Sequence, residues 1–144
     1  MANVFDVAAY ILEMQGSMSA MKLQKLVYYS QAWALVWDDE PLFNNVIEAW
    51  ANGPVVRDLY EKHRGKYQTA ASDFVAFQDG NLDKNQKDSI DHVLKAYGDK
   101  SAQWLSDQTH SEMPWIEARK GLSDMERGHN EIKISTMAEY YGSL

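Results

Sequence analysis

The chain has 144 residues, no cysteine and a formal net charge of −7 at pH 7. This length fits one domain, residues 1–144, which can bury enough apolar surface to fold without a metal ion or a disulfide. The missing cysteines exclude disulfides, thiolate zinc sites and cysteine nucleophiles, and the acidic balance argues against a surface that binds duplex nucleic acid.

The N-terminal segment and the apolar runs indicate a cytoplasmic protein that does not enter a membrane. No basic region precedes the first apolar residues, and Asp6 lies among them, so the pattern of a signal peptide is missing. Lys22, Lys25 and Gln31 interrupt the longest apolar stretch, which is therefore too short to cross a bilayer. The absence of cysteine also suits a reducing compartment.

Two helices are predicted at the start of the chain. Apolar residues at helical spacing indicate a helix from 3 to 15, with Asn3 as its N-cap. Ser19 is the expected cap of a second helix, from about 20 to 37. Lys25 keeps one side of its first half polar, whereas apolar and aromatic residues surround its second half. We therefore expect other elements to cover that second half on most sides.

A short strand and a further helix are predicted next. Residues 46–51 contain β-favouring residues and read as a strand, and Asn52-Gly53 is a turn signal. Proline suits the first turn of a helix because its missing N–H costs nothing there. Pro54 is therefore expected to open a helix that ends near Gly65.

The second half of the chain is predicted to be mostly helical. Residues 66–82 are the least regular part, with one short extended piece at 73–77. Asp83 and Gln86 form a capping-box pattern in front of a helix that ends near Gly98.

Three more elements are expected after that helix. Ser101 begins a helix, and Pro114 opens a further turn or helix that ends near residue 121. Residues 132–134 read as a strand that joins the strand at 46–51 in a small sheet, and Thr136 caps a last helix. The predicted fold class is mainly α with a small β-sheet (α+β), arranged as a single compact helical domain.

His110 is the best candidate for chemistry in this sequence. It lies close to Asp107 and Glu112, and a histidine beside carboxylates can act as a general acid or base, or as one metal ligand. The sequence has no HExxH motif, no GxGxxG, Walker or GxSxG motif, and no second histidine at helical spacing. A histidine before a Pro-Trp corner is more often a packed residue. We predict no enzyme, catalytic residue, cofactor or metal site, with a small hydrolase or metal-dependent enzyme that uses His110 as the alternative.

Basic and aromatic residues suggest possible binding surfaces. A local basic patch is carried by Arg57, Lys62, His63, Arg64 and Lys66. We interpret it as a solvated helix end, so nucleic acid is not an expected partner. Five tryptophans and eight tyrosines are many for this length. Each alone is readily explained as core, but together they predict that a few face outward as interface anchors.

Three spaced motifs resemble a known family. The segments KLQKLVYYSQAW and PLF, then IEAWANGPVV with a nearby tyrosine, and finally THSEMPW resemble the Panacea domain of SocA-type antitoxins, also called phage-associated GepA-like proteins. The resemblance covers nearly the whole chain. The matching residues are Lys22, Leu23, Lys25, Leu26 and Tyr28 in the first motif, Trp50, Gly53, Pro54, Val55 and Tyr60 in the second, and His110, Pro114 and Trp115 in the third.

The resemblance implies a non-enzymatic antitoxin that binds and neutralises a cognate protein toxin, usually encoded by an adjacent gene. Some relatives instead act as proteolytic adaptors that deliver the toxin to a ClpXP-type protease. Others carry an added DNA-binding domain, for which a chain of this length has no room, so autoregulation of transcription is not expected. A transcriptional regulator is kept as a further alternative.

The motif residues are interpreted mainly as scaffold, which leaves other positions to contact a toxin. Lys22 and Lys25 are expected to lay their stems along apolar surface and keep their ammonium groups in water. Toxin contacts are expected on the exposed aromatic residues of the helix at 21–37 and around residues 57–60. The candidate contacts are Tyr29, Trp33, Trp37, Arg57 and Tyr60.

Overall fold

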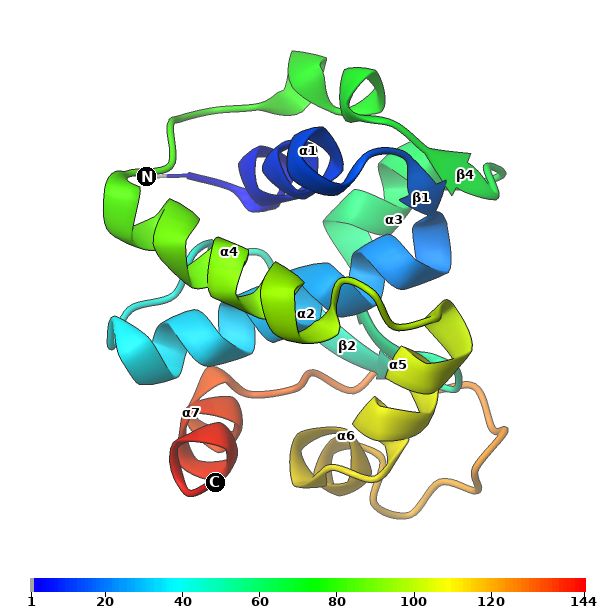
Figure 1. The fold of residues 1–144 in the computed structure, drawn as a ribbon. Helices are drawn as coiled ribbons and strands as arrows, with labels where there is room; N and C mark the ends of the chain where they lie inside the picture. Colours follow the sequence, from blue (N-terminus) through cyan, green and yellow to red (C-terminus); the bar gives the residue numbers. More distant parts are fainter. Residues whose placement is uncertain (1) are drawn as a thin grey trace.

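Helix α2 (Ala20–Trp37) is the central element of the computed structural model, which describes residues 2–144. Figure 1 shows α1 (Val4–Gln15) above it, α4 (Lys84–Tyr97) in front of it and α7 (Ile134–Gly142) below it. Every residue of α2 from 23 to 32 is buried, whereas Trp37 at its end is exposed. The second half of α2 is therefore covered on most sides, as expected, and the exposed residue of that half lies in its last turn.

The predicted helix caps form as expected at three places. The Asn3 side chain accepts hydrogen bonds from the backbone N–H groups of residues 5 and 6. The Ser19 hydroxyl accepts one from the N–H of Lys22. Asp83 and Gln86 form a reciprocal capping box at the start of α4. These caps satisfy backbone donors that the first helical turn leaves unpaired, which is why the sequence located these helices well.

A hairpin follows α2 and replaces a predicted helix start. Strand β2 (Ile47–Trp50) pairs with the antiparallel strand β3 (Gly53–Val56), and Pro54 lies opposite Ala49. The prediction that Pro54 opens a helix is therefore wrong. The tight turn returns the chain onto β2, and the β-branched valines at 55 and 56 suit a buried strand. Helix α3 (Arg57–His63) begins only after this strand.

The region after α3 also differs from the expectation. Strand β4 (Gln68–Thr69) pairs with β1 (Met18–Ser19), and two 3₁₀ turns follow, η1 (Ala71–Asp73) and η2 (Val75–Phe77). The extended piece predicted at 73–77 is wrong. The Asp73 carboxylate accepts a hydrogen bond from the Ala70 N–H, which favours a turn there.

The C-terminal part contains α5 (Ala102–His110), α6 (Met113–Ala118) and α7. The predicted strand at 132–134 is wrong, because α7 already begins at Ile134 after the N-cap Lys133 rather than after Thr136. The preceding segment still lies beside β2, where Glu131 forms an isolated bridge with Glu48.

The predicted fold class is confirmed. The part of the chain that the structure describes contains seven α-helices and two two-stranded antiparallel sheets. The buried apolar side chains gather in one cluster around α2. None of the described helices combines the length and the apolar character needed to cross a bilayer.

Candidate functional site

Lys25 and Gly53, one from each of the first two motifs, meet at the centre of the fold. Gly53 has a φ of +120°, and a Cβ atom added there would lie 2.5 Å from Lys25 Cε and 3.2 Å from Thr109 Oγ1. Only glycine allows both this backbone conformation and this close approach. The contact fixes the hairpin against α2 and brings α5 to the same point.

The Lys25 ammonium group is fully buried, which corrects the expectation that it lies in water. Nζ has no hydrogen-bond partner among the described residues. Burial lowers the pKa of Lys25 to about 8, because the charged form loses its hydration. Lys22 differs from it, since its side chain is partly exposed.

Gln24 connects the same part of α2 to β3 and α3. Its side chain accepts a hydrogen bond of 2.9 Å from the Val56 N–H and donates one to the Val56 carbonyl. Its amide nitrogen also lies 3.0 Å from His63 Nε2. Burial lowers the pKa of His63, and the charge of Lys25 adds to the shift. Sequence reasoning missed Gln24, because a glutamine shows no partner until the chain is folded.

The third motif attaches to the second through Trp115. The Trp115 indole Nε1 donates a 2.8 Å hydrogen bond to the Trp50 carbonyl. The ring of His110 lies 4.2 Å from the Trp115 ring, measured between centroids. Burial lowers the pKa of His110, and the charge of Lys25 lowers it further. All three motifs therefore converge on the region around the hairpin.

Most motif residues are part of the interior. The buried ones are Leu23, Lys25, Leu26, Tyr28, Gly53, Pro54, Val55, Pro114 and Trp115.

The carboxylates near His110 are engaged elsewhere. Within the described residues, no hydrogen bond joins the His110 ring to Asp107 or Glu112. Glu112 is buried, and its Oε1 accepts hydrogen bonds from the hydroxyls of Tyr29 (2.7 Å) and Tyr141 (2.8 Å). No group of three or more histidine, aspartate or glutamate side chains in residues 2–144 is placed to hold a metal ion.

The buried Glu112 explains where Tyr29 lies. The Tyr29 ring stacks on Tyr97 at 4.3 Å and is completely buried. The expectation that Tyr29 faces outward is therefore wrong. Its hydroxyl instead donates a hydrogen bond to the buried carboxylate of Glu112. Nothing in the sequence around Glu112 indicated this role, because its tyrosine partners are far away in the chain.

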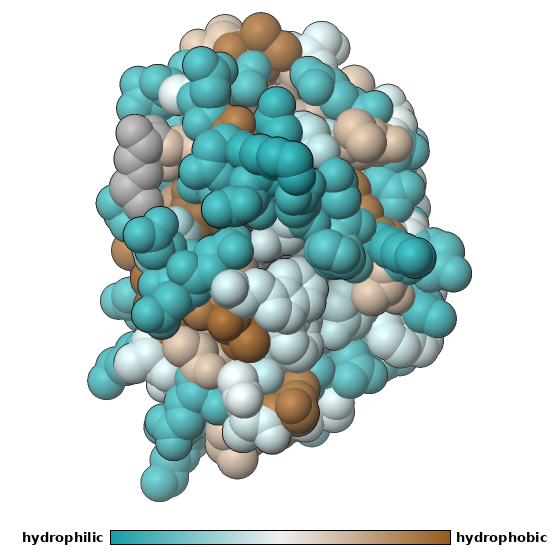
Figure 2. All heavy atoms as spheres, turned by 60° about the vertical axis from the view of Figure 1, so that its left-hand side comes forward, coloured by the Kyte–Doolittle hydropathy of each residue, from teal (hydrophilic) through white to brown (hydrophobic). Residues whose placement is uncertain are grey.

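The aromatic residues at the end of α2 do reach the surface. Trp37 is 48% exposed, and its ring stacks on the half-buried Trp33 at 5.3 Å. Figure 2, which brings this end of α2 forward, shows hydrophilic residues over the upper part of the face and paler, less polar residues in its lower middle. Two of the three aromatic contacts predicted on α2 are thus accessible at least in part.

A pocket of about 540 Å³ opens beside the hairpin and α3. Its aromatic wall is formed by Trp50 and Tyr60, whose rings meet edge to face at 4.8 Å. The guanidinium of Arg57 lies 5.5 Å above the Trp50 ring, a cation–π contact. The structure therefore brings two predicted contact residues, Arg57 and Tyr60, together with the motif residue Trp50. We name this cavity the Trp50 pocket.

Glu48 holds Arg57 and His129 in place on one side of the Trp50 pocket. Its carboxylate lies 3.2 Å from Arg57 Nε and 3.4 Å from His129 Nδ1. Burial alone raises the pKa of Glu48, but hydrogen bonds from Trp50 and Arg57 and the charge of Arg57 outweigh it, so the pKa is lowered. Glu48 therefore stays ionised and fixes Arg57 over the aromatic wall.

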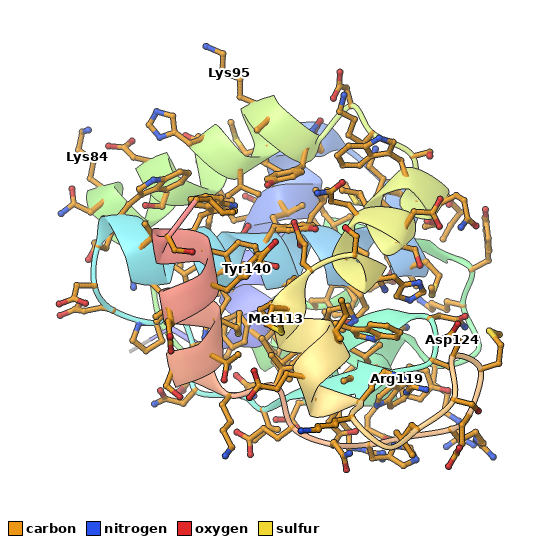
Figure 3. All side chains as sticks on the ribbon, turned by 90° about the horizontal axis from the view of Figure 1, so that it is seen from below. Lys84, Lys95, Met113, Arg119, Asp124 and Tyr140 are labelled. Carbon is orange, nitrogen blue, oxygen red and sulfur yellow. The ribbon has the colours of Figure 1, made fainter. Side chains whose placement is uncertain are left out.

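A second cavity, of about 760 Å³, lies beside α6 and is lined by His110, Trp115 and the loop that follows α6. Arg119 is buried there and donates hydrogen bonds to the carbonyls of Ala49 and Ser123. Figure 3 shows Arg119 beside the loop that carries Asp124, while Met113 and Tyr140 lie on α6 and α7. Arg119 thus attaches this loop to the hairpin.

Comparison with protein families identifies the family to which the chain belongs. Residues 23–116 match the family described as antitoxin SocA-like, Panacea domain. The chain belongs to this family. No curated protein and no solved structure matched the chain. The matched Panacea region includes Trp50, Arg57 and Tyr60 in the Trp50 pocket, whereas Arg127 and His129 come from outside it.

Proposed function

We propose that this protein is an antitoxin that neutralises a cognate protein toxin by direct binding in the cytoplasm. Membership of the Panacea family, whose description names an antitoxin, is the observation that carries the proposal. The packing of the motif residues supports it, because these residues connect α2, the hairpin and α6 to one another. A rigid frame of this kind can hold a binding surface without any bond-making chemistry.

The surface that contacts the toxin is proposed to include the Trp50 pocket and the exposed end of α2. Arg57 and Tyr60 belong to the first, and Trp33 and Trp37 to the second. Tryptophan, tyrosine and arginine are the residues most enriched among interface hot spots. An interface of standard size buries about 800 Å² on each partner, which is enough to include several such anchors.

The gene next to the one that encodes this protein is expected to encode the toxin. Its expression alone should arrest growth, and co-expression of this protein should restore growth. The two purified proteins should elute together in size-exclusion chromatography. A failure of rescue with every adjacent gene would contradict the proposal.

The half-life of the toxin separates direct masking from delivery to a ClpXP-type protease. Masking leaves the half-life of the toxin unchanged or lengthens it, because the bound toxin is folded and protected. An adaptor shortens it, and the shortening disappears in cells that lack the protease.

The variant His110→Ala tests the alternative of an enzyme. An antitoxin that only binds its toxin should still neutralise that toxin in the growth assay when this side chain is removed and the fold is intact.

A further inference from the structure

We propose that the Trp50 pocket binds a carboxylate side chain from an acidic segment of the partner polypeptide. The inference rests on the proposed function and adds the chemistry of the toxin segment that is recognised. It begins from the charges around the pocket, which are opposite in sign to those of the protein as a whole.

The Trp50 pocket is basic although the chain carries a net charge of −7. Arg57, Arg64 and Arg127 line it, and Glu61 is the acidic residue among the described lining residues. The buried ammonium of Lys25 lies behind its wall, close enough to His63 to lower the pKa of that ring further after the larger effect of burial. A concave surface with this charge attracts an anion, although the chain as a whole is acidic.

Two of the three arginines are not neutralised by the protein itself. Arg57 is paired with Glu48 and lies 3.8 Å from Glu61. Arg64 and Arg127 are exposed and form no ion pair or side-chain hydrogen bond within residues 2–144. A guanidinium group presents donors in a flat fork that matches the two oxygens of a carboxylate. These two side chains are therefore the ones available to an incoming acid.

The other walls suit the rest of an amino-acid side chain. Trp50 and Tyr60 supply flat apolar surface, and the exposed Met21 also lines the pocket. The hydroxyl of Tyr60 makes no hydrogen bond within the described residues, so it can donate one to a carboxylate. An aromatic wall next to free arginines fits the carbon chain of a glutamate or aspartate and its charged end together.

A polypeptide fits these observations better than a nucleic acid does. A duplex carries one charge for each 1.7 Å or so of its axis, so binding it requires a row of cations along an extended surface. Here three arginines line one pocket of about 540 Å³, while the chain as a whole carries a net charge of −7. Such a pocket suits an isolated carboxylate, whereas the net negative charge of the chain disfavours a polyanion.

The first experiment uses the full chain and two synthetic peptides with blocked ends. The acidic peptide has the sequence AEYEEA, and the neutral control has the sequence AQYQQA. Heteronuclear NMR follows the indole N–H of Trp50 and the backbone N–H groups of α3. The acidic peptide is expected to shift these signals saturably, and raising NaCl from about 50 mM to about 500 mM should weaken its binding. Equal shifts with both peptides, or none with either, would overturn the proposal.

Charge-reversal variants distinguish binding of the acidic peptide at the Trp50 pocket from a general electrostatic attraction between the peptide and the protein. Arg64→Glu/Arg127→Glu is expected to raise the dissociation constant of the acidic peptide about tenfold or more. Lys95→Glu/Lys133→Glu makes the same change in net charge at exposed positions that do not line the pocket, and should change it less than about twofold. Both variants should lower the unfolding midpoint only slightly and to a similar extent, because none of the four side chains forms an ion pair in the described residues. Arg64 and Lys95 each lose only the small favourable interaction of a cation with a helix C-terminus. An equal effect of both variants contradicts a specific pocket.

Short duplex DNA and inorganic phosphate serve as competing probes in the same titration. Shifts from DNA that equal or exceed those from the acidic peptide would overturn the proposal in favour of nucleic acid. Displacement of the acidic peptide by free phosphate at micromolar concentration would overturn it in favour of a phosphate site. A failure of both competitors to displace the acidic peptide supports the proposal.

Neutralisation assays then separate this inference from the proposed function. If the parent chain rescues growth and Arg64→Glu/Arg127→Glu does not, while Lys95→Glu/Lys133→Glu does, both proposals are supported. If both variants rescue growth, the antitoxin role is supported and the acidic contact is overturned. If the parent chain rescues growth from no adjacent gene, the proposed function fails, and the peptide titration still decides whether the pocket binds carboxylates.

Discussion

At the scale of single residues, the contact between Lys25 and Gly53 shows how a sequence motif acts through packing. A lysine is rarely buried without a partner, since the charged form loses hydration that nothing replaces. Here the Lys25 side chain fills the space left by the missing side chain of Gly53. The residues of two motifs that are far apart in the sequence are thus linked, because Lys25 fits only where residue 53 has no side chain.

Gly53→Ala is expected to destabilise the protein by about 3 kcal/mol, from backbone strain at φ +120° together with overpacking against Lys25. Gly16 supplies a matched control. It also has a positive φ, of +87°, but nothing lies within 4 Å of an added Cβ. Gly16→Ala should therefore have only the backbone cost, of about 1–2 kcal/mol, without the overpacking. Urea unfolding of both variants measures the difference, and equal losses would show that Lys25 moves aside freely.

At the scale of elements, the hairpin is held from both sides. Gln24 on α2 bonds the backbone of Val56, while Trp115 on α6 bonds the carbonyl of Trp50. Arg119 bonds the carbonyl of Ala49 and holds residues 119–130 beside the hairpin. The walls of the Trp50 pocket therefore depend on elements that are separated by more than 60 residues.

Arg119→Ala is expected to release the loop, because the carbonyls that it satisfies must find water instead. Hydrogen–deuterium exchange of residues 120–129 should rise sharply, and stability should fall by about 3 kcal/mol, as for the loss of a buried charged hydrogen-bonding group. Arg127→Ala lies in the same loop, is exposed and has no partner among the described residues, so it should change neither quantity. Unchanged exchange in Arg119→Ala would show that the loop is fixed by other contacts.

At the scale of the whole molecule, buried titratable groups set the pH at which the fold is most stable. The folded pKa of Lys25, about 8, is below its ordinary value, so burying the charged form costs stability below pH 8 and the cost disappears as pH rises toward 10.5. Burial raises the pKa values of Tyr28, Tyr29 and Tyr141, so their contribution is present below pH 10 and is lost above it. Burial lowers the pKa of His110, whose contribution is lost as pH falls below 6.5.

Lys25→Met is expected to be more stable than the parent by up to about 3 kcal/mol at pH 7, because the substitution removes the buried charge and retains most of the volume. The advantage should shrink as pH rises from 8 to 10. Urea unfolding of both proteins across this range measures it, and the tyrosines cancel in the difference because both proteins contain them. A constant difference would show that the Lys25 ammonium is hydrated in the folded state.

Local patterns predicted much of the fold. Asn3, Ser19 and Asp83 cap helices through contacts within three residues, so the sequence alone located those helices. Pro54 misled the prediction, because the same residue suits a helix start and a strand beside a tight turn. The choice between these depends on whether the following valines pack against α2, which is a long-range contact.

The sequence by itself determined the family and the mainly helical fold class, because these depend on spaced motifs and local periodicity. Only the tertiary structure decided that Lys25 and Tyr29 are buried, that Glu112 anchors the tyrosines, and that Arg64 and Arg127 meet at one pocket. The physical reason is distance along the chain. A side chain's burial and partners are set by segments that fold back onto it, and these partners are not encoded in its neighbours.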